Sequence, residues 1–140
     1  MKINGINHLC FSVSDLDRSV AFYRDALGAK LLVTGRKLAY FELGGIWVAL
    51  NAEELERRTE PQTYTHLAFT VNDSEFDQWT ERLRELKVNV LPGRARDERD
   101  KRSVYFADPD GHRFELHTGT LTDRLDYYRE AKGHMIFHEG

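Results

Sequence analysis

The chain has 140 residues, of which 41% are apolar and 31% charged, and its formal net charge is −3. This length and apolar content suffice for a buried core, and the weak negative charge argues against binding to nucleic acid or to an anionic membrane. The sequence has a single cysteine, no apolar run of transmembrane length and no signal-peptide pattern at its N-terminus. We therefore expect one soluble, cytoplasmic domain over residues 1–140.

Two short segments share one pattern. Residues 8–13 read HLCFSV, and residues 66–71 read HLAFTV. In each, apolar residues alternate with small or polar ones, which is the period-two pattern of a half-buried strand. We expect two strands that carry His8 and His66 at matching positions of an internal repeat.

The first half is predicted to follow its strand with a helix, a strand and a hairpin. Ser14 is expected to cap the helix and Gly28 to end it. The hairpin turns at Gly44-Gly45, where glycine permits the positive φ that tight turns need. The strands after the helix are expected over residues 30–34, 38–43 and 46–51.

The second half repeats this plan. Asn72-Asp73 offers the cap of a helix whose apolar residues recur at helical spacing up to Leu86. Its hairpin turns at Asp-Pro-Asp-Gly, residues 108–111, and its strands are expected over residues 88–91, 103–107 and 113–117.

The predicted fold class is therefore α+β, with a β-α-β-β-β unit that occurs twice in a single domain. Module 1 covers about residues 4–51, a connection covers 52–63, and module 2 covers about 64–117. A C-terminal tail over 118–140 follows, with helical spacing from about residue 121 to 130, and is expected to pack on the outside.

Glu115 is a third candidate for a site that contains the two histidines. It lies between Phe114 and Leu116 on a strand expected to pack on the core, where a carboxylate is costly unless it is paired or binds a cation. Together with His8 and His66 it forms a two-histidine, one-carboxylate set that leaves coordination positions open for a substrate. The pattern alone also permits ordinary core or surface histidines. The remaining histidines lack this register and are interpreted as structural or surface residues: His112, His117, His134 and His138.

Further motifs accompany this pattern. They lie at residues 6–13, 38–41, 47–51, 64–66, 93–97, 105–106, 108–112, 114–115 and 119–125. In combination these motifs resemble the fosfomycin resistance proteins of the vicinal oxygen chelate superfamily, and most closely their bacillithiol-dependent metallothiol transferase branch. The resemblance covers nearly the whole chain.

The resemblance implies two βαβββ modules that form a cup-shaped mixed sheet around a metal site, with modules paired across a homodimer. Each site would take His8 from one subunit and His66 and Glu115 from the other. The implied metal is Mg²⁺ or Mn²⁺, although the ligand types alone suggest iron or zinc. Glu115 can also exchange protons in related chemistries, and a ligand role is expected here.

The resemblance also implies that the protein inactivates fosfomycin, a small epoxide that carries a phosphonate. Arg94 and Arg124 are the expected phosphonate donors, because a guanidinium matches a tetrahedral oxyanion through paired hydrogen bonds. Trp47 is expected beside the methyl group of the substrate. The expected neutral donors are Tyr40, Asn51, Tyr64 and Tyr105, although aromatic residues on strands are usually core. A solvated loop that covers the site is predicted to contain the basic residues Arg96, Arg99, Lys101 and Arg102.

The expected nucleophile is an external thiol, with bacillithiol as the preferred donor and L-cysteine as a poorer one. Water-using members of the family carry a glutamate base just ahead of the Tyr40 strand, where this chain has Lys37-Leu38-Ala39. Cys10 shares the face of His8. It is interpreted either as a small buried residue or as a neighbour of the substrate, and not as an obligatory nucleophile.

Two other functions remain open at this point. The same three ligands occur in iron-dependent enzymes that cleave catechol rings, but the cationic donors favour an anionic substrate. A drug-sequestering protein of the same fold is the second alternative. Such a protein needs no metal ligands, whereas this chain has all three candidates.

Overall fold

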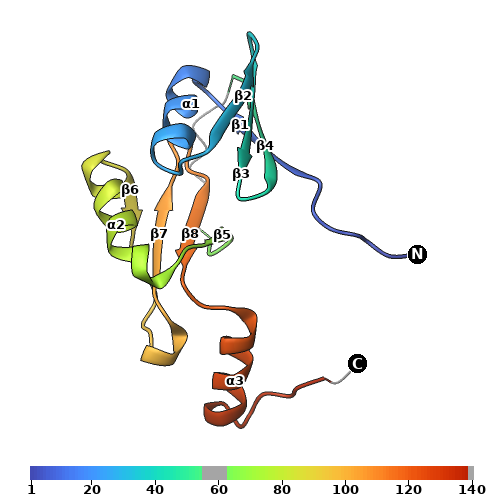
Figure 1. Ribbon diagram of the computed structural model, residues 1–140, viewed down its shortest axis with the longest axis vertical. Coiled ribbons are helices and arrows are strands. Elements are labelled where there is room, and N and C mark those ends of the chain that lie inside the picture. The colour runs from blue at the N-terminus through green and yellow to red at the C-terminus, as the bar shows by residue number, and fades with distance from the viewer. Residues whose placement is uncertain (55–62, 139–140) are drawn as a thin grey trace.

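The computed structural model describes residues 1–54 and 63–138 (Figure 1). The first half consists of β1 (His8–Val13), α1 (Leu16–Asp25), β2 (Lys30–Thr34), β3 (Leu38–Leu43) and β4 (Ile46–Ala52). The second half consists of β5 (Leu67–Thr70), the 3₁₀ helix η1 (Asp73–Glu75), α2 (Phe76–Glu85), β6 (Asn89–Leu91), the 3₁₀ helix η2 (Glu98–Asp100), β7 (Ser103–Ala107), β8 (Arg113–His117) and the helix α3 (Leu121–Ala131). The predicted element order is confirmed. The predicted connection falls largely on residues 55–62, which lie outside the described residues.

Each half forms its own four-stranded sheet. The strand orders are β1-β4-β3-β2 and β5-β8-β7-β6, so the two halves have the same topology. In both sheets the first strand runs parallel to the last strand of the half, and the hairpin is antiparallel. The α+β fold class predicted from the repeat is therefore confirmed.

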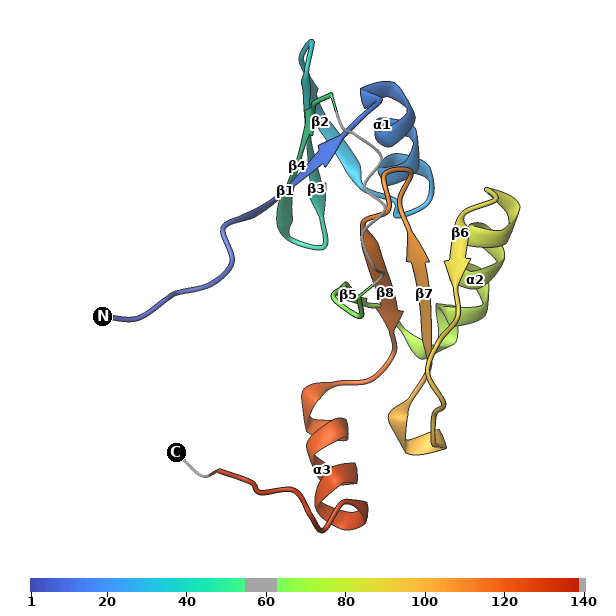
Figure 2. The same cartoon turned by 180° about the vertical axis from the view of Figure 1, so that it is seen from behind.

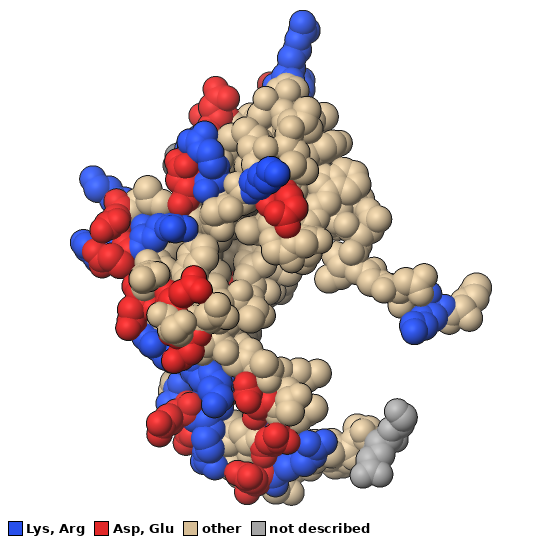
Figure 3. Space-filling model, in the orientation of Figure 1, with Lys and Arg blue, Asp and Glu red and all other residues tan. Residues whose placement is uncertain are grey.

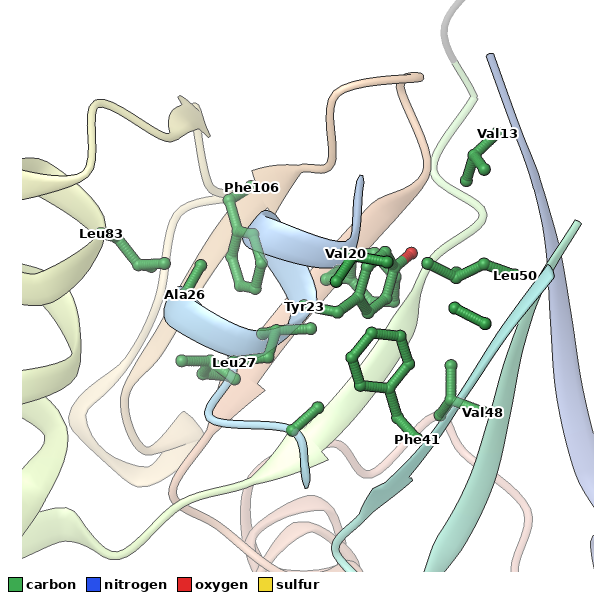
Figure 4. Packing of buried hydrophobic residues seen from close by; sticks show 14 of the residues in the cluster. Val13, Val20, Tyr23, Ala26, Leu27, Phe41, Val48, Leu50, Leu83 and Phe106 are labelled. Atoms are coloured by element: carbon green, nitrogen blue, oxygen red, sulfur yellow. The ribbon is translucent and has the colours of Figure 1, made fainter. Parts of the chain in front are cut away.

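The apolar core joins the two halves, and Tyr23 of α1 lies near its centre (Figure 4). Its ring centroid is 5.9 Å from that of Phe41 in the first sheet and 6.1 Å from that of Phe114 in the second. All three side chains are fully buried. Helix α1 thus packs its apolar face against both sheets, which fixes the relative placement of the halves.

A buried polar contact crosses the same core. The Tyr23 hydroxyl donates to Asp108 Oδ2 at 2.8 Å, and burial raises the pKa of this carboxyl above its usual range. Asp108 also accepts the backbone N–H groups of Asp110 and His112. The imidazole of His112 returns to the first half, with Nε2 2.8 Å from the carbonyl oxygen of Ser12. The turn between β7 and β8 therefore ties the second half to the first.

The start of α1 corrects one prediction. Asp15, and not Ser14, is the N-cap, and its carboxylate accepts the backbone N–H of Arg18 at 3.0 Å. Ser14 instead donates its backbone N–H and its hydroxyl to Asp110. Serine and aspartate cap helices about equally well. Ser14 is bound to Asp110 of the other half, which leaves Asp15 to cap the helix.

Helix α3 stands apart from both sheets, next to η2, and the predicted helical tail is confirmed (Figure 2). Thr120 caps it through the backbone N–H of Asp123. Charged side chains gather around α2 and α3, whereas the face over β3 and β4 is mostly uncharged (Figure 3). Within the described part of the chain, no helix has the length and apolar character needed to cross a membrane.

Replacing Tyr23 by phenylalanine tests the link between the halves. We expect Tyr23→Phe to lower the free energy of unfolding by about 1–3 kcal/mol, because the buried Oδ2 of Asp108 loses the donor that the Tyr23 hydroxyl supplies. Urea denaturation measures this difference. The control is Tyr127→Phe, because the Tyr127 ring is also buried but its hydroxyl makes no hydrogen bond among the described residues. An equal loss of unfolding free energy in Tyr23→Phe and Tyr127→Phe would contradict a stabilising role for the hydrogen bond between Tyr23 and Asp108.

Candidate functional site

His66, which directly precedes β5, is held in one tautomer. Its Nδ1 lies 2.6 Å from the carbonyl oxygen of Tyr64. A carbonyl oxygen only accepts, so Nδ1 carries the proton and Nε2 keeps its lone pair. Nε2 lies 3.7 Å from Glu115 Oε1. This is the arrangement in which a histidine is oriented to bind a metal through Nε2.

Glu115 is a buried carboxylate with cationic and polar neighbours. Its residue is 6% exposed, and the flanking Phe114 and Leu116 belong to the core. Arg96 Nη2 lies 3.6 Å from the same Oε1 that His66 approaches. Burial and a hydrogen bond to Glu115 raise the pKa of Tyr105, so its hydroxyl stays protonated at neutral pH. The expected strand environment of this carboxylate is therefore observed.

Tyr64 and Tyr105 complete the surroundings of this pair. Their hydroxyl oxygens are 2.8 Å apart, and the Tyr64 ring lies against His66 with 4.8 Å between centroids. We call the following group the C-terminal half-site: Tyr64, His66, Arg94, Arg96, Tyr105, Glu115 and Arg124. It presents cationic and hydroxyl donors beside two potential metal ligands.

Asp100 brings together the two arginines predicted to bind a phosphonate. It is 5% exposed, and its Oδ1 accepts from Arg94 Nη2 at 3.2 Å. Arg124 Nη1 lies 3.7 Å from this oxygen, and its Nη2 donates to the Asp100 carbonyl oxygen at 3.3 Å. The hydrogen bond from Arg94 lowers the pKa of Asp100, which is thus ionised at neutral pH. Asp100 was not predicted to belong to the site, and its only signal in the sequence is its place in the charged segment 96–102.

The interpretation of Arg96 as part of a solvated loop is wrong. Its side chain is 17% exposed and donates to the Tyr105 hydroxyl at 2.8 Å and to the Asp100 carbonyl oxygen at 3.2 Å. Arg99 and Arg102 do face solvent and pair with acids outside the half-site. Arg96 therefore reaches the half-site as Arg94 does, and nothing in the sequence of residues 96–102 distinguishes it from the exposed Arg99.

A second group of candidates lies on one face of the first sheet. His8 is opposite Trp47 in the β1–β4 register, with ring centroids 4.5 Å apart, and Tyr40 contacts Trp47 at 5.1 Å. His8 Nδ1 lies 2.7 Å from Asn7 Oδ1, an acceptor, so its Nε2 also keeps the lone pair. We call this group the N-terminal half-site: His8, Cys10, Tyr40, Trp47 and Asn51.

Cys10 is exposed, so its interpretation as a small buried residue is wrong. Asn51 Nδ2 donates to its Sγ at 3.5 Å. Alternation along β1 turns Leu9 toward the interior and leaves Cys10 on the face of His8. The thiol therefore belongs to the N-terminal half-site.

In the described part of one chain, the possible metal ligands of the two half-sites are not grouped together. Across residues 1–54 and 63–138, no three His, Cys, Asp or Glu side chains are grouped closely enough to hold a metal. His66 and Glu115 lie together, whereas His8 lies apart from them. The donors themselves, two imidazole Nε2 atoms and one carboxylate, fit a divalent metal. Of these three donors, His66 and Glu115 lie together in the described part of one chain.

Comparison with known proteins identifies the family. Residues 5–116 match the model of the Glyoxalase/Bleomycin resistance protein/Dioxygenase superfamily. The chain is 57% identical to the metallothiol transferase FosB of Lysinibacillus sphaericus over 138 residues, which cover 98% of each protein. It is also 57% identical to the metallothiol transferase FosB of Staphylococcus saprophyticus, over 98% of this chain and 91% of that protein. The chain belongs to this superfamily, in its metallothiol transferase FosB branch.

Solved structures of the fosfomycin resistance protein FosX of Listeria monocytogenes share the fold. One, in complex with Mn(II) and a sulfate ion, is 35% identical, has a TM-score of 0.82, and is matched over 91% of this chain and 99% of that chain. A mutant form, in complex with Mn(II) and 1S,2S-dihydroxypropylphosphonic acid, is 32% identical with a TM-score of 0.80, over 89% of this chain and 99% of that chain.

Removal of one imidazole tests the metal assignment. We expect His66→Ala to weaken Mn²⁺ binding by about 100-fold or more. Loss of a residue that only orients a ligand already lowers metal affinity by about 10–100-fold, and loss of the ligand itself should cost at least as much. Isothermal titration with Mn²⁺ measures this change. His134→Ala is the control, since His134 is exposed in the C-terminal tail. Unchanged affinity in His66→Ala would remove this residue from the site.

Proposed function

We propose that this chain adds a low-molecular-weight thiol, bacillithiol and less efficiently L-cysteine, to the epoxide of fosfomycin. The observation that carries the proposal is the C-terminal half-site, in which Arg94 and Arg124 converge beside His66 and Glu115. The relatives at 57% identity are metallothiol transferases, which supports transfer to a thiol. In the reaction a C–S bond forms and an epoxide C–O bond breaks. The thiol loses a proton, and the new alkoxide takes one up.

The proposed metal ligands are His8, His66 and Glu115. A divalent cation, Mg²⁺ or Mn²⁺, polarises the epoxide oxygen when it is bound there. The hydrogen bonds at Nδ1 orient both imidazoles, and core packing orients the carboxylate. Mn(II) in the FosX structures supports this choice of metal class.

The phosphonate would be bound by Arg94 and Arg124. Their two positive charges exceed the single negative charge of Asp100, so the cluster keeps attraction for an anion. The hydroxyl of Tyr105 stays protonated, and it would donate its single proton to the phosphonate in place of Glu115. In the N-terminal half-site, Trp47 supplies an apolar wall for the methyl group of the substrate.

An external thiolate is the proposed nucleophile, because thiols ionise appreciably near neutral pH. The segment just ahead of Tyr40 offers no competing carboxylate base. It contains Lys37, which faces solvent, and Ala39, which is fully buried. The absence of a carboxylate in this segment favours thiol addition over hydration. We place the protein in the cytoplasm, because a reducing compartment keeps low-molecular-weight thiols in the reduced form.

We further propose a homodimer in which each site combines the N-terminal half-site of one chain with the C-terminal half-site of the other. The separation of His8 from His66 and Glu115 within the chain supports this arrangement. No nucleic acid or membrane is needed as a partner.

Product analysis tests the proposed reaction. Incubation of the protein with fosfomycin, Mn²⁺ and bacillithiol should yield a product with the summed mass of drug and thiol, measured by mass spectrometry. The controls are the same mixture without protein and with His66→Ala. A diol in place of the adduct would indicate hydration, and metal-independent drug binding without product would indicate sequestration. Oxygen consumption with catechols and Fe²⁺ would indicate ring cleavage.

Mixing two inactive variants tests the shared site. His8→Ala and Glu115→Gln should each be inactive alone, because each damages both sites of a dimer. When the two are co-expressed in equal amounts, half of the dimers are mixed and carry one intact site, so about a quarter of wild-type activity should return. Thiol-adduct formation measures the recovery. Absence of recovery, with mixed dimers verified by mass, would place His8 and Glu115 of one chain in one site.

A further inference from the structure

We propose that Arg96 couples the binding of the metal to the binding of the phosphonate. Its positive charge beside Glu115 opposes a second cation until the anionic substrate arrives. This inference rests on the proposed function, because it assigns a role to Arg96 within the same site.

Two groups approach one oxygen of Glu115. His66 Nε2 lies 3.7 Å from Oε1, and Arg96 Nη2 lies 3.6 Å from the same atom. A metal ion shared by His66 and Glu115 would therefore stand within a few ångströms of the guanidinium. Solvent screens this repulsion weakly, since the Arg96 side chain is 17% exposed and that of Glu115 is 9% exposed.

The Arg96 guanidinium is held in place. It donates to the Tyr105 hydroxyl at 2.8 Å and to the Asp100 carbonyl oxygen at 3.2 Å. Its Cζ lies 5.8 Å from the centroid of the Tyr105 ring. The contact with the Asp100 carbonyl oxygen does not involve Glu115, so it would hold the Arg96 charge in position when the carboxylate binds another cation.

The charge balance of the C-terminal half-site indicates how a bound anion would affect metal binding. Asp100 forms ion pairs with both Arg94 and Arg124, and Glu115 forms an ion pair with Arg96. Once a metal ion also binds Glu115, positive charge around that carboxylate is in excess. A phosphonate dianion near the guanidinium groups would offset the excess, so anion and metal should each strengthen the binding of the other.

Metal titration tests the coupling without any reaction. Free Mn²⁺ is followed by electron paramagnetic resonance, with and without propylphosphonate, which has no epoxide. In the wild-type protein propylphosphonate should raise the Mn²⁺ affinity, by about tenfold as a typical coupling. Arg96→Gln should bind Mn²⁺ about tenfold more tightly than wild type in the absence of the anion, since one positive charge near the ion is removed. The gain from propylphosphonate should shrink in this variant.

Two further variants separate charge from structure. Arg99→Gln is the matched control, because Arg99 lies in the same segment but is 51% exposed and pairs with Asp97, and wild-type behaviour is expected. Arg96→Lys keeps the charge, so its Mn²⁺ affinity without the anion should lie within about twofold of wild type. Equal or weaker Mn²⁺ binding by Arg96→Gln relative to Arg99→Gln would overturn the proposal.

The wild-type protein provides an independent check if Arg96→Gln does not fold. Absence of any effect of propylphosphonate on Mn²⁺ affinity in wild type would also overturn the coupling. No thiol takes part, so a protein that fails to form the fosfomycin adduct but shows this coupling would refute the proposed function alone.

Discussion

The burial of one carboxylate governs the arrangement of this protein's site. Glu115 is 6% exposed and lies on β8 between the core residues Phe114 and Leu116. A buried charge without partners costs several kcal/mol, so the surrounding structure must supply cations and donors. Here His66 and Arg96 do so, both through Oε1. The carboxylate thus takes its position from core packing, which is more rigid than a loop, and the groups around it are arranged before any ligand binds.

The contact between the two halves fixes where the N-terminal half-site lies relative to Glu115. Tyr23, Asp108 and the turn after β7 fix one sheet relative to the other, and α1 fills the space between them. In this arrangement the described residues His8, His66 and Glu115 are not grouped together, although the sequence repeat places the two histidines at equivalent positions. In our proposal the same rigidity becomes useful in a dimer, because each chain presents two well-placed half-sites to its partner.

Local signals sufficed to predict the fold, and contacts between distant segments limited the prediction of the site. Period-two strands, helical spacing and glycine turns act over a few residues, so the βαβββ order was predictable. The environment of a charged loop depends on what it packs against. Arg96 and Asp100 therefore looked like solvated residues, whereas Arg96 is half-buried against Tyr105 and Asp100 is buried beside Arg94 and Arg124. The capping role of Asp15 likewise follows from a contact that the sequence does not display, between Ser14 and Asp110 of the other half.

The most direct measurement is a crystal structure of the protein grown with Mn²⁺. We predict one ion per site, bound by Nε2 of His66 and Oε1 of Glu115 from one chain and by Nε2 of His8 from a second chain. An ion bound without His8, or three ligands contributed by a single chain, would contradict the shared site on which the proposed function depends.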